Sequence, residues 1–129
     1  MDADDEAHPD RLLRQFEVFQ QHPEVGLVGT LFDSIDTNGN TILPSDRSLL
    51  IRKSSFARFA HGSIMLRREM FDRVGGYRDR CIYWEDLDLY LRCARVGRVG
   101  ILADTLYRFR YAPTSTITAN QDDWSVPWI

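Results

Sequence analysis

The chain has 129 residues and 43% of them are hydrophobic, which is enough to bury one core and unlike the composition of a disordered segment. Its formal net charge of -3 gives no reason to expect nucleic acid as a partner. Its 2 cysteines form neither a disulfide framework nor a zinc site, and no apolar run approaches the roughly 20 residues that span a bilayer. Because the N-terminus is acidic and unlike a signal peptide, we expect a cytoplasmic location. A larger parent protein that contains this chain could act at the inner face of the membrane.

The first predicted elements are a helix and a buried strand. Residues 9–21 are predicted to form a helix, because proline suits its first turn and apolar residues recur at helical spacing at Leu12, Phe16 and Phe19. This spacing is that of an amphipathic helix with these side chains on its apolar face. Residues 25–32 are nearly continuously apolar and rich in β-forming side chains, which is typical of a strand covered on both faces.

The later elements are predicted from turn residues and shorter apolar runs. A turn at 36–39 separates the first strand from a short returning strand, and the two glycines after residue 74 are typical of a helix end. The later strands are expected at 41–43, 61–66, 99–102 and 105–111, the later helices at 67–74 and 85–96, and a loop with a short helix at 44–55. Cys93 is expected to be buried on the last helix. One domain over 1–117 is expected, followed by a flexible or docking tail over 118–129.

The acidic N-terminus is a candidate metal site. Asp2, Asp4 and Asp5 precede the first predicted helix, and carboxylate oxygens are hard ligands that suit Mg²⁺ or Mn²⁺. Such a metal could bridge a diphosphate and stabilise the charge on a leaving group. The alternative is a solvated acidic tail. A phosphatase with an Asp-x-Asp-x-Thr motif is excluded, because position 6 is Glu6.

A second acidic group opens the predicted helix over 85–96. Glu85 and Asp86 could simply complement the helix dipole, an effect of up to ~1 kcal/mol. Trp84, however, offers an aromatic wall for a sugar ring, and a sugar hydroxyl that attacks needs a base within hydrogen-bond reach. We therefore favour Asp86 as a general base. Asp88 and Arg92, four residues apart, are interpreted as a surface ion pair.

Three further side chains are candidates for ligand contacts. Arg108 and Arg110 alternate along the last predicted strand, so both point to the same side. They could form a phosphate clamp or lie on an exposed sheet face, and the sequence favours neither. His61 starts a predicted strand, where a histidine is more often structural than functional.

The order of several short motifs resembles the family 2 nucleotide-sugar glycosyltransferases, which have the Rossmann-like GT-A fold, an α/β fold with a mixed sheet flanked by helices. The motifs, in chain order, are Asp-Ala-Asp-Asp, Val-Gly-Leu-Val-Gly-Thr, His-Gly-Ser-Ile-Met-Leu-Arg-Arg, Val-Gly-Gly-Tyr, Glu-Asp-Leu-Asp-Leu-Tyr-Leu-Arg and Leu-Tyr-Arg-Phe-Arg. The resemblance covers residues 1–117. It implies transfer of a sugar from a nucleotide-sugar donor to a sugar or lipid-linked acceptor.

The resemblance also implies roles for individual residues. Asp2 and Asp4 would form the Asp-x-Asp element, with Asp4 as the ligand of Mg²⁺ or Mn²⁺ and Asp2 reaching the ribose or a metal-bound water. Asp86 would be the base of an inverting transfer, with Glu85 beside it in the acceptor site. The remaining candidates are, for the donor, Arg108 and Arg110 and, for the acceptor, Trp84 and His61.

The half of such an enzyme that holds the nucleobase is expected to be missing. In this family a nucleotide-binding half precedes the Asp-x-Asp motif, whereas Met1 stands directly before Asp2 here. The alternative function is therefore that of an inactive fragment that self-associates as a homo-oligomer, because an incomplete sheet leaves an exposed edge at which a second copy can pair. A nucleotidyltransferase of related fold is disfavoured, because Glu85 and Asp86 suit deprotonation of an acceptor.

Overall fold

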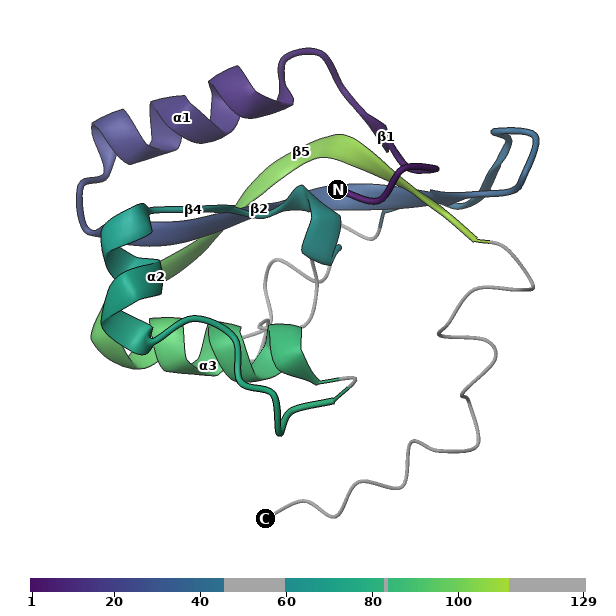
Figure 1. Cartoon of the computed structure of the whole chain (residues 1–129). Helices are drawn as coiled ribbons and strands as arrows, with labels where there is room; N and C mark the ends of the chain where they lie inside the picture. Colours follow the sequence, from purple (N-terminus) through teal and green to yellow (C-terminus); the bar gives the residue numbers. More distant parts are fainter. Residues whose placement is uncertain (46–59, 83, 112–129) are drawn as a thin grey trace.

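The computed structural model describes residues 1–45, 60–82 and 84–111. In this part of the chain a central mixed sheet has helices on both of its faces (Figure 1), which confirms the predicted α/β class. The elements are β1 (Glu6–Ala7), α1 (Arg11–Gln21), β2 (Val25–Ile35), β3 (Thr41–Leu43), η2 (His61–Ser63), β4 (Met65–Leu66), α2 (Arg68–Val74), α3 (Glu85–Val96) and β5 (Arg98–Arg110). The predicted tail over 118–129 and most of the predicted segment 44–55 lie outside the described residues.

The centre of the sheet is a long parallel pair formed by β2 and β5. β2 is buried along most of its length, as its apolar run predicts, and Leu27 and Ile35 are both 0% exposed. It continues beyond the predicted end, because its pairing with β5 extends to Ile35 opposite Arg110. β5 joins the two predicted final strands into one, and the register shifts where Ala103 and Asp104 intervene.

Short antiparallel strands complete the sheet. The strand order is β1-β5-β2-β3, and β4 pairs with β2 at Leu27 and Val28. The predicted turn between β2 and β3 is confirmed. The Asp36 carboxylate accepts hydrogen bonds from the backbone N–H groups of Asn38 and Asn40, at 2.9 and 2.8 Å, and so closes the turn.

The predicted strand over 61–66 is wrong in its first half. Residues His61–Ser63 form the 3-10 turn η2, and only Met65–Leu66 are extended as β4. The Ser63 hydroxyl and the Ser63 N–H group both donate to the Ala60 carbonyl oxygen, at 2.7 and 2.8 Å. These local bonds curl the chain where the apolar pattern alone indicates an extended segment.

Helix α1 lies on one face of the sheet (Figure 1). The side that it turns toward the sheet is not the predicted one. Gln15 and Phe19 are buried, whereas Leu12 and Phe16 are 58% and 53% exposed. The predicted apolar face is therefore wrong at two of its three positions. Gln15 decides the orientation, because its side-chain amide donates to the buried Val28 carbonyl oxygen of β2 at 2.9 Å.

Helices α2 and α3 cover the opposite face of the sheet (Figure 1). The core there consists of Leu27, Met70, Leu89, Tyr90 and Cys93. Met70 reaches between two glycines, since a methyl group at Gly26 or Gly97 would lie 2.0 or 2.4 Å from its terminal carbon. α2 ends where Gly75 adopts a φ of 79°, as the glycine pair predicts. Cys93 is fully buried on α3, as predicted.

Candidate functional site

The acidic N-terminus divides into one structural carboxylate and two outward ones. Asp5 is held in the fold, because its carboxylate accepts from the Tyr107 hydroxyl at 2.5 Å and from the Arg110 N–H group at 2.7 Å. Asp2 and Asp4 are exposed. Arg110 also bonds the Asp4 carbonyl oxygen at 2.7 Å, which anchors the backbone of this segment. Two of the three predicted acids therefore remain available to a ligand.

The two arginines of β5 point the same way, as predicted, and both contact Glu6 on β1. Glu6 Oε2 is 2.5 Å from Arg108 Nη1, and Glu6 Oε1 is 2.7 Å from Arg110 Nη2. Arg108 also donates to the Gly39 carbonyl oxygen, and Arg110 to the Asp36 carbonyl oxygen. Their guanidinium groups thus join β1, β5 and the β2–β3 turn. The phosphate clamp stays a prediction, and a phosphate would have to share these groups with Glu6.

The N-terminus of α3 separates two neighbouring carboxylates by their partners. Asp88 accepts two hydrogen bonds from Arg92, at 2.8 and 2.6 Å. Asp86 is half-buried, and one of its oxygens accepts from the Leu87 N–H group at 2.7 Å. Among the described residues no hydrogen bond reaches its other oxygen. Asp86 therefore keeps one carboxylate oxygen for a ligand, whereas Asp88 is paired with Arg92, and the third acid of this turn, Glu85, is exposed to solvent.

The Asp88–Arg92 pair forms as its spacing predicts, but the prediction that it is a surface pair is wrong. The Arg92 side chain is only 9% exposed and that of Asp88 21%. Arg92 also donates to the Val74 carbonyl oxygen at 2.7 Å and so ties α3 to α2. Burial by itself raises the pKa of Asp88, but the hydrogen bond and charge of Arg92, together with Arg78 and Cys81, outweigh burial and lower that pKa.

The turn η2 lies between the two acidic groups. A methyl group at Gly62 would lie 2.0 Å from the Tyr107 hydroxyl oxygen and 3.2 Å from the Met1 Cα, so the turn packs against the N-terminal segment (Figure 1). On its other side, His61 Nδ1 is 2.7 Å from the hydroxyl oxygen of Tyr90 on α3. One short turn therefore contacts both the segment with Asp2 and Asp4 and the helix with Asp86.

Two buried polar side chains of α1 hold this turn in place. The Gln15 amide donates to the Ser63 carbonyl oxygen at 2.7 Å, and Arg11 donates to the same oxygen at 3.2 Å. Arg11 also lies over the Tyr107 ring, with its guanidinium carbon 5.8 Å from the ring centroid. Sequence reasoning missed these residues because polar side chains on a predicted amphipathic helix are normally assigned to solvent.

Two tyrosines near Asp86 were also missed. Burial raises the pKa of Tyr90, and the negative charge of Asp86 raises it further. The same two causes, in the same order, raise the pKa of Tyr77, whose hydroxyl oxygen is 3.1 Å from His61 Nε2. The available signal was the spacing of Asp86 and Tyr90, four residues apart on one helix, which places them on the same side.

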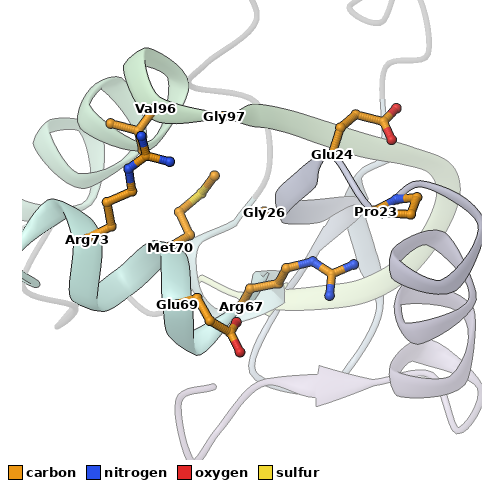
Figure 2. A pocket seen from close by; sticks show the side chains of 9 residues that line it. All are labelled: Pro23, Glu24, Gly26, Arg67, Glu69, Met70, Arg73, Val96 and Gly97. Carbon is orange, nitrogen blue, oxygen red and sulfur yellow. The ribbon is translucent and has the colours of Figure 1, made fainter.

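A separate pocket of about 200 Å³ opens at the amino ends of β2 and β5 (Figure 2). Glu24, Arg67, Met70 and Arg73 are among its lining residues, so its charges are mixed. The Arg67 guanidinium donates to the backbone carbonyl oxygens of Val25 and Phe19, at 2.9 and 2.6 Å. The predicted site residues do not line this pocket. They lie toward the carboxyl end of β5 and the N-terminus of α3.

The outward acids fit a divalent cation only as a partial shell. Over residues 1–45, 60–82 and 84–111, no three His, Cys, Asp or Glu side chains gather as a metal-binding group. Mg²⁺ is commonly held by one or two carboxylates, with phosphate oxygens and water as its other ligands. Asp2 and Asp4 would supply at most the two carboxylates of such a shell, and the metal site stays a prediction. In the same described ranges, no helix is both long and apolar enough to cross a membrane.

The described fold is that of a mixed α/β protein, in which the exposed Asp2 and Asp4 lie on one side of the turn η2 and the half-buried Asp86 lies on the other. No protein-family model matches the chain. It is 34% identical over 117 residues to the putative glycosyltransferase EpsE of Bacillus subtilis, and 30% identical over 118 residues to the amylovoran biosynthesis glycosyltransferase AmsE of Erwinia amylovora. It is 27% identical over 117 residues to an uncharacterized glycosyltransferase of Methanocaldococcus jannaschii.

These matches relate the chain to glycosyltransferases. They cover 84% and 85% of this chain in the first two cases, but 41% and 43% of the relatives. The chain therefore spans about two fifths of the length of these relatives.

Proposed function

We propose that this chain forms the metal-binding and acceptor side of an inverting glycosyltransferase of family 2 type, which uses a nucleotide-sugar donor. The observation that carries the proposal is the half-buried Asp86 carboxylate, which keeps an oxygen for a ligand while its neighbour Asp88 is occupied by Arg92. The relatives, which are named glycosyltransferases, support the same class of reaction.

In the proposed reaction Asp86 accepts the proton of the acceptor hydroxyl as that oxygen attacks the anomeric carbon. The bond from the anomeric carbon to the diphosphate oxygen breaks on the opposite side, so the configuration inverts and the nucleoside diphosphate leaves. A bound Mg²⁺ or Mn²⁺ would supply charge neutralisation on that diphosphate, with Asp4 as ligand and Asp2 on the ribose or a metal-bound water. Glu85 and Trp84 would contact the acceptor, and Arg108 and Arg110 the donor phosphates.

The substitution Asp86→Asn tests this proposal in the natural full-length protein. It keeps the shape of the side chain and removes the base, so turnover with nucleotide-sugar and acceptor should fall about 10²–10⁴-fold. The matched control is Asp72→Asn, because Asp72 is an exposed aspartate on α2. Steady-state kinetics of the two variants decide the matter. Similar losses in both variants would show that Asp86 is not the base.

A second role, self-association, is favoured by the exposed apolar side chains of α1. Leu12, Leu13 and Phe16 are all more than half exposed, at 58%, 57% and 53%. Among the described strands, β1 covers the outer edge of β5 only opposite Tyr107 and Arg108. Exposed apolar side chains and an unpaired strand edge are both sites at which a second copy can bind. In this role the chain would assemble as a homo-oligomer without turnover of its own.

A further inference from the structure

Three aromatic side chains form a hydrogen-bonded row beside Asp86. His61 lies in the middle, with Nδ1 2.7 Å from Tyr90 Oη and Nε2 3.1 Å from Tyr77 Oη. The rings also pack, with centroids 6.0 Å apart for His61 and Tyr90 and 5.9 Å apart for His61 and Tyr77. Both imidazole nitrogens are therefore engaged. A direct hydrogen bond from His61 to an acceptor would have to displace one tyrosine.

The two ends of the row differ in exposure. Tyr90 is 2% exposed and follows Asp86 by one turn on α3. Tyr77 is 46% exposed, and its ring rests on that of Phe71 with centroids 5.9 Å apart. The row thus runs from the core to the surface at the end of α3 that carries Asp86. The Tyr77 hydroxyl is its solvent-facing group.

The chemistry of a neutral imidazole makes the directions of the two hydrogen bonds depend on each other. Such a ring donates through one nitrogen and accepts through the other. When Tyr90 donates to Nδ1 of His61, the ring hydrogen is on Nε2 and is donated to Tyr77 Oη. The hydrogen of the Tyr77 hydroxyl then points away from His61 and can be donated to a ligand.

We propose that Tyr77 is an acceptor-binding residue and that Tyr90 orients it through the His61 tautomer. The inference rests on the proposed function, in which Asp86 deprotonates an acceptor hydroxyl. Tyr77 would donate to one oxygen of the acceptor while Asp86 accepts from the hydroxyl that reacts. A polyhydroxylated acceptor, such as a sugar, suits this pair because each of its hydroxyl groups can both accept and donate. His61 and Tyr90 act as positioning residues.

The tautomer can be measured independently of activity. In the natural full-length protein labelled with ¹⁵N-histidine, long-range ¹H–¹⁵N correlation spectra distinguish a proton on Nε2 from one on Nδ1. We expect His61 to carry its proton on Nε2 in the wild type and in Tyr77→Phe, and to lose this preference in Tyr90→Phe. His22 is the internal control, because its Nδ1 faces Glu24 at 3.7 Å rather than a tyrosine. A His61 proton on Nδ1 in the wild type would overturn the proposal.

Kinetics test the binding role of Tyr77. Tyr77→Phe removes the hydroxyl and keeps the ring contacts. The KM for the acceptor should therefore rise about three- to tenfold, as expected for one lost hydrogen bond. The factor by which kcat falls should be smaller than the factor by which this KM rises. A fall in kcat at unchanged KM would contradict the proposal. If Asp86→Asn leaves turnover intact, the proposed function fails, whereas the tautomer measurement still decides whether Tyr90 orients His61.

Discussion

Asp86 and Asp88 lie two positions apart in the first turn of α3, yet their carboxylates do different work. Asp88 neutralises Arg92, whose side chain is 9% exposed and would otherwise be a buried charge without an anionic partner at this position. Asp86 is not paired with Arg92, and its negative charge contributes to the raised pKa values of Tyr77 and Tyr90. Asp88 is therefore a structural acid because it pairs with Arg92 at 2.6 Å and lies 3.5 Å from Arg78, and Asp86 is the candidate base.

The substitution Asp88→Asn should lower the free energy of unfolding by about 1.5–3 kcal/mol, because it leaves the Arg92 charge without its carboxylate. Urea denaturation measures this, with Asp72→Asn as the exposed control. A change within about 0.5 kcal/mol, the range of ordinary surface substitutions, would show that the pair contributes little.

The same pair predicts a dependence of stability on pH. Because the folded protein lowers the pKa of Asp88, the pair stabilises the fold above the unfolded-state pKa of roughly 3.9, and this contribution is lost as the pH falls from that value through the lower folded-state pKa. We expect the unfolding free energy of Asp88→Asn to fall less steeply than that of the wild type over this acid range. Parallel curves from pH 6 downward would contradict the assignment.

At the scale of elements, the turn η2 contacts both the N-terminal segment and α3 and so connects them. Gln15 and Arg11 hold it from one side through the Ser63 carbonyl oxygen, and Tyr107 fills the space that the missing side chain of Gly62 leaves. The Tyr107 hydroxyl in turn holds Asp5. A change in the turn should therefore reach the acidic segment.

The substitution Gly62→Ala tests this connection. Its new methyl group would lie 2.0 Å from the Tyr107 hydroxyl oxygen, and Tyr107 is 1% exposed and cannot move into solvent. We expect a loss of about 1–3 kcal/mol, typical of overpacking, measured by thermal or urea unfolding. Gly100→Ala is the matched control, because its nearest contact would be an ordinary 3.7 Å. Tyr107→Phe should reduce the extra cost of Gly62→Ala, and equal costs in both backgrounds would contradict the proposed clash.

At the scale of the whole molecule, the two faces of the sheet are covered unequally. α2 and α3 enclose the cluster around Leu27 and Leu89, whereas α1 covers the other face with Phe19 and keeps Leu13 and Phe16 outside. If these side chains and the open edge of β5 bind a second copy, the chain should sediment as a dimer at micromolar concentration. Leu13→Glu should weaken this dimer, whereas Leu91→Glu, at a 45% exposed position on α3, should not. A compact wild-type monomer that melts cooperatively would rule out self-association.

The sequence by itself determined the elements whose signal is local. The apolar run of β2, the glycine pair after α2, the turn at Asp36 and the acidic start of α3 were all predicted correctly, because each depends on neighbouring residues and their intrinsic preferences. The motif order led to the same protein class as the relatives, since it too is a property of the linear chain.

Only the tertiary structure decided which side chains these elements turn toward one another. The roll of α1 depends on the bond from Gln15 to Val28, the burial of Arg92 on its bond to Val74, and the engagement of His61 on Tyr77 and Tyr90. These partners are 13 to 29 residues apart in the chain. Buried polar groups need hydrogen-bond partners, and these groups become buried only when the helices pack on the sheet. No local pattern in the sequence could therefore predict these hydrogen bonds.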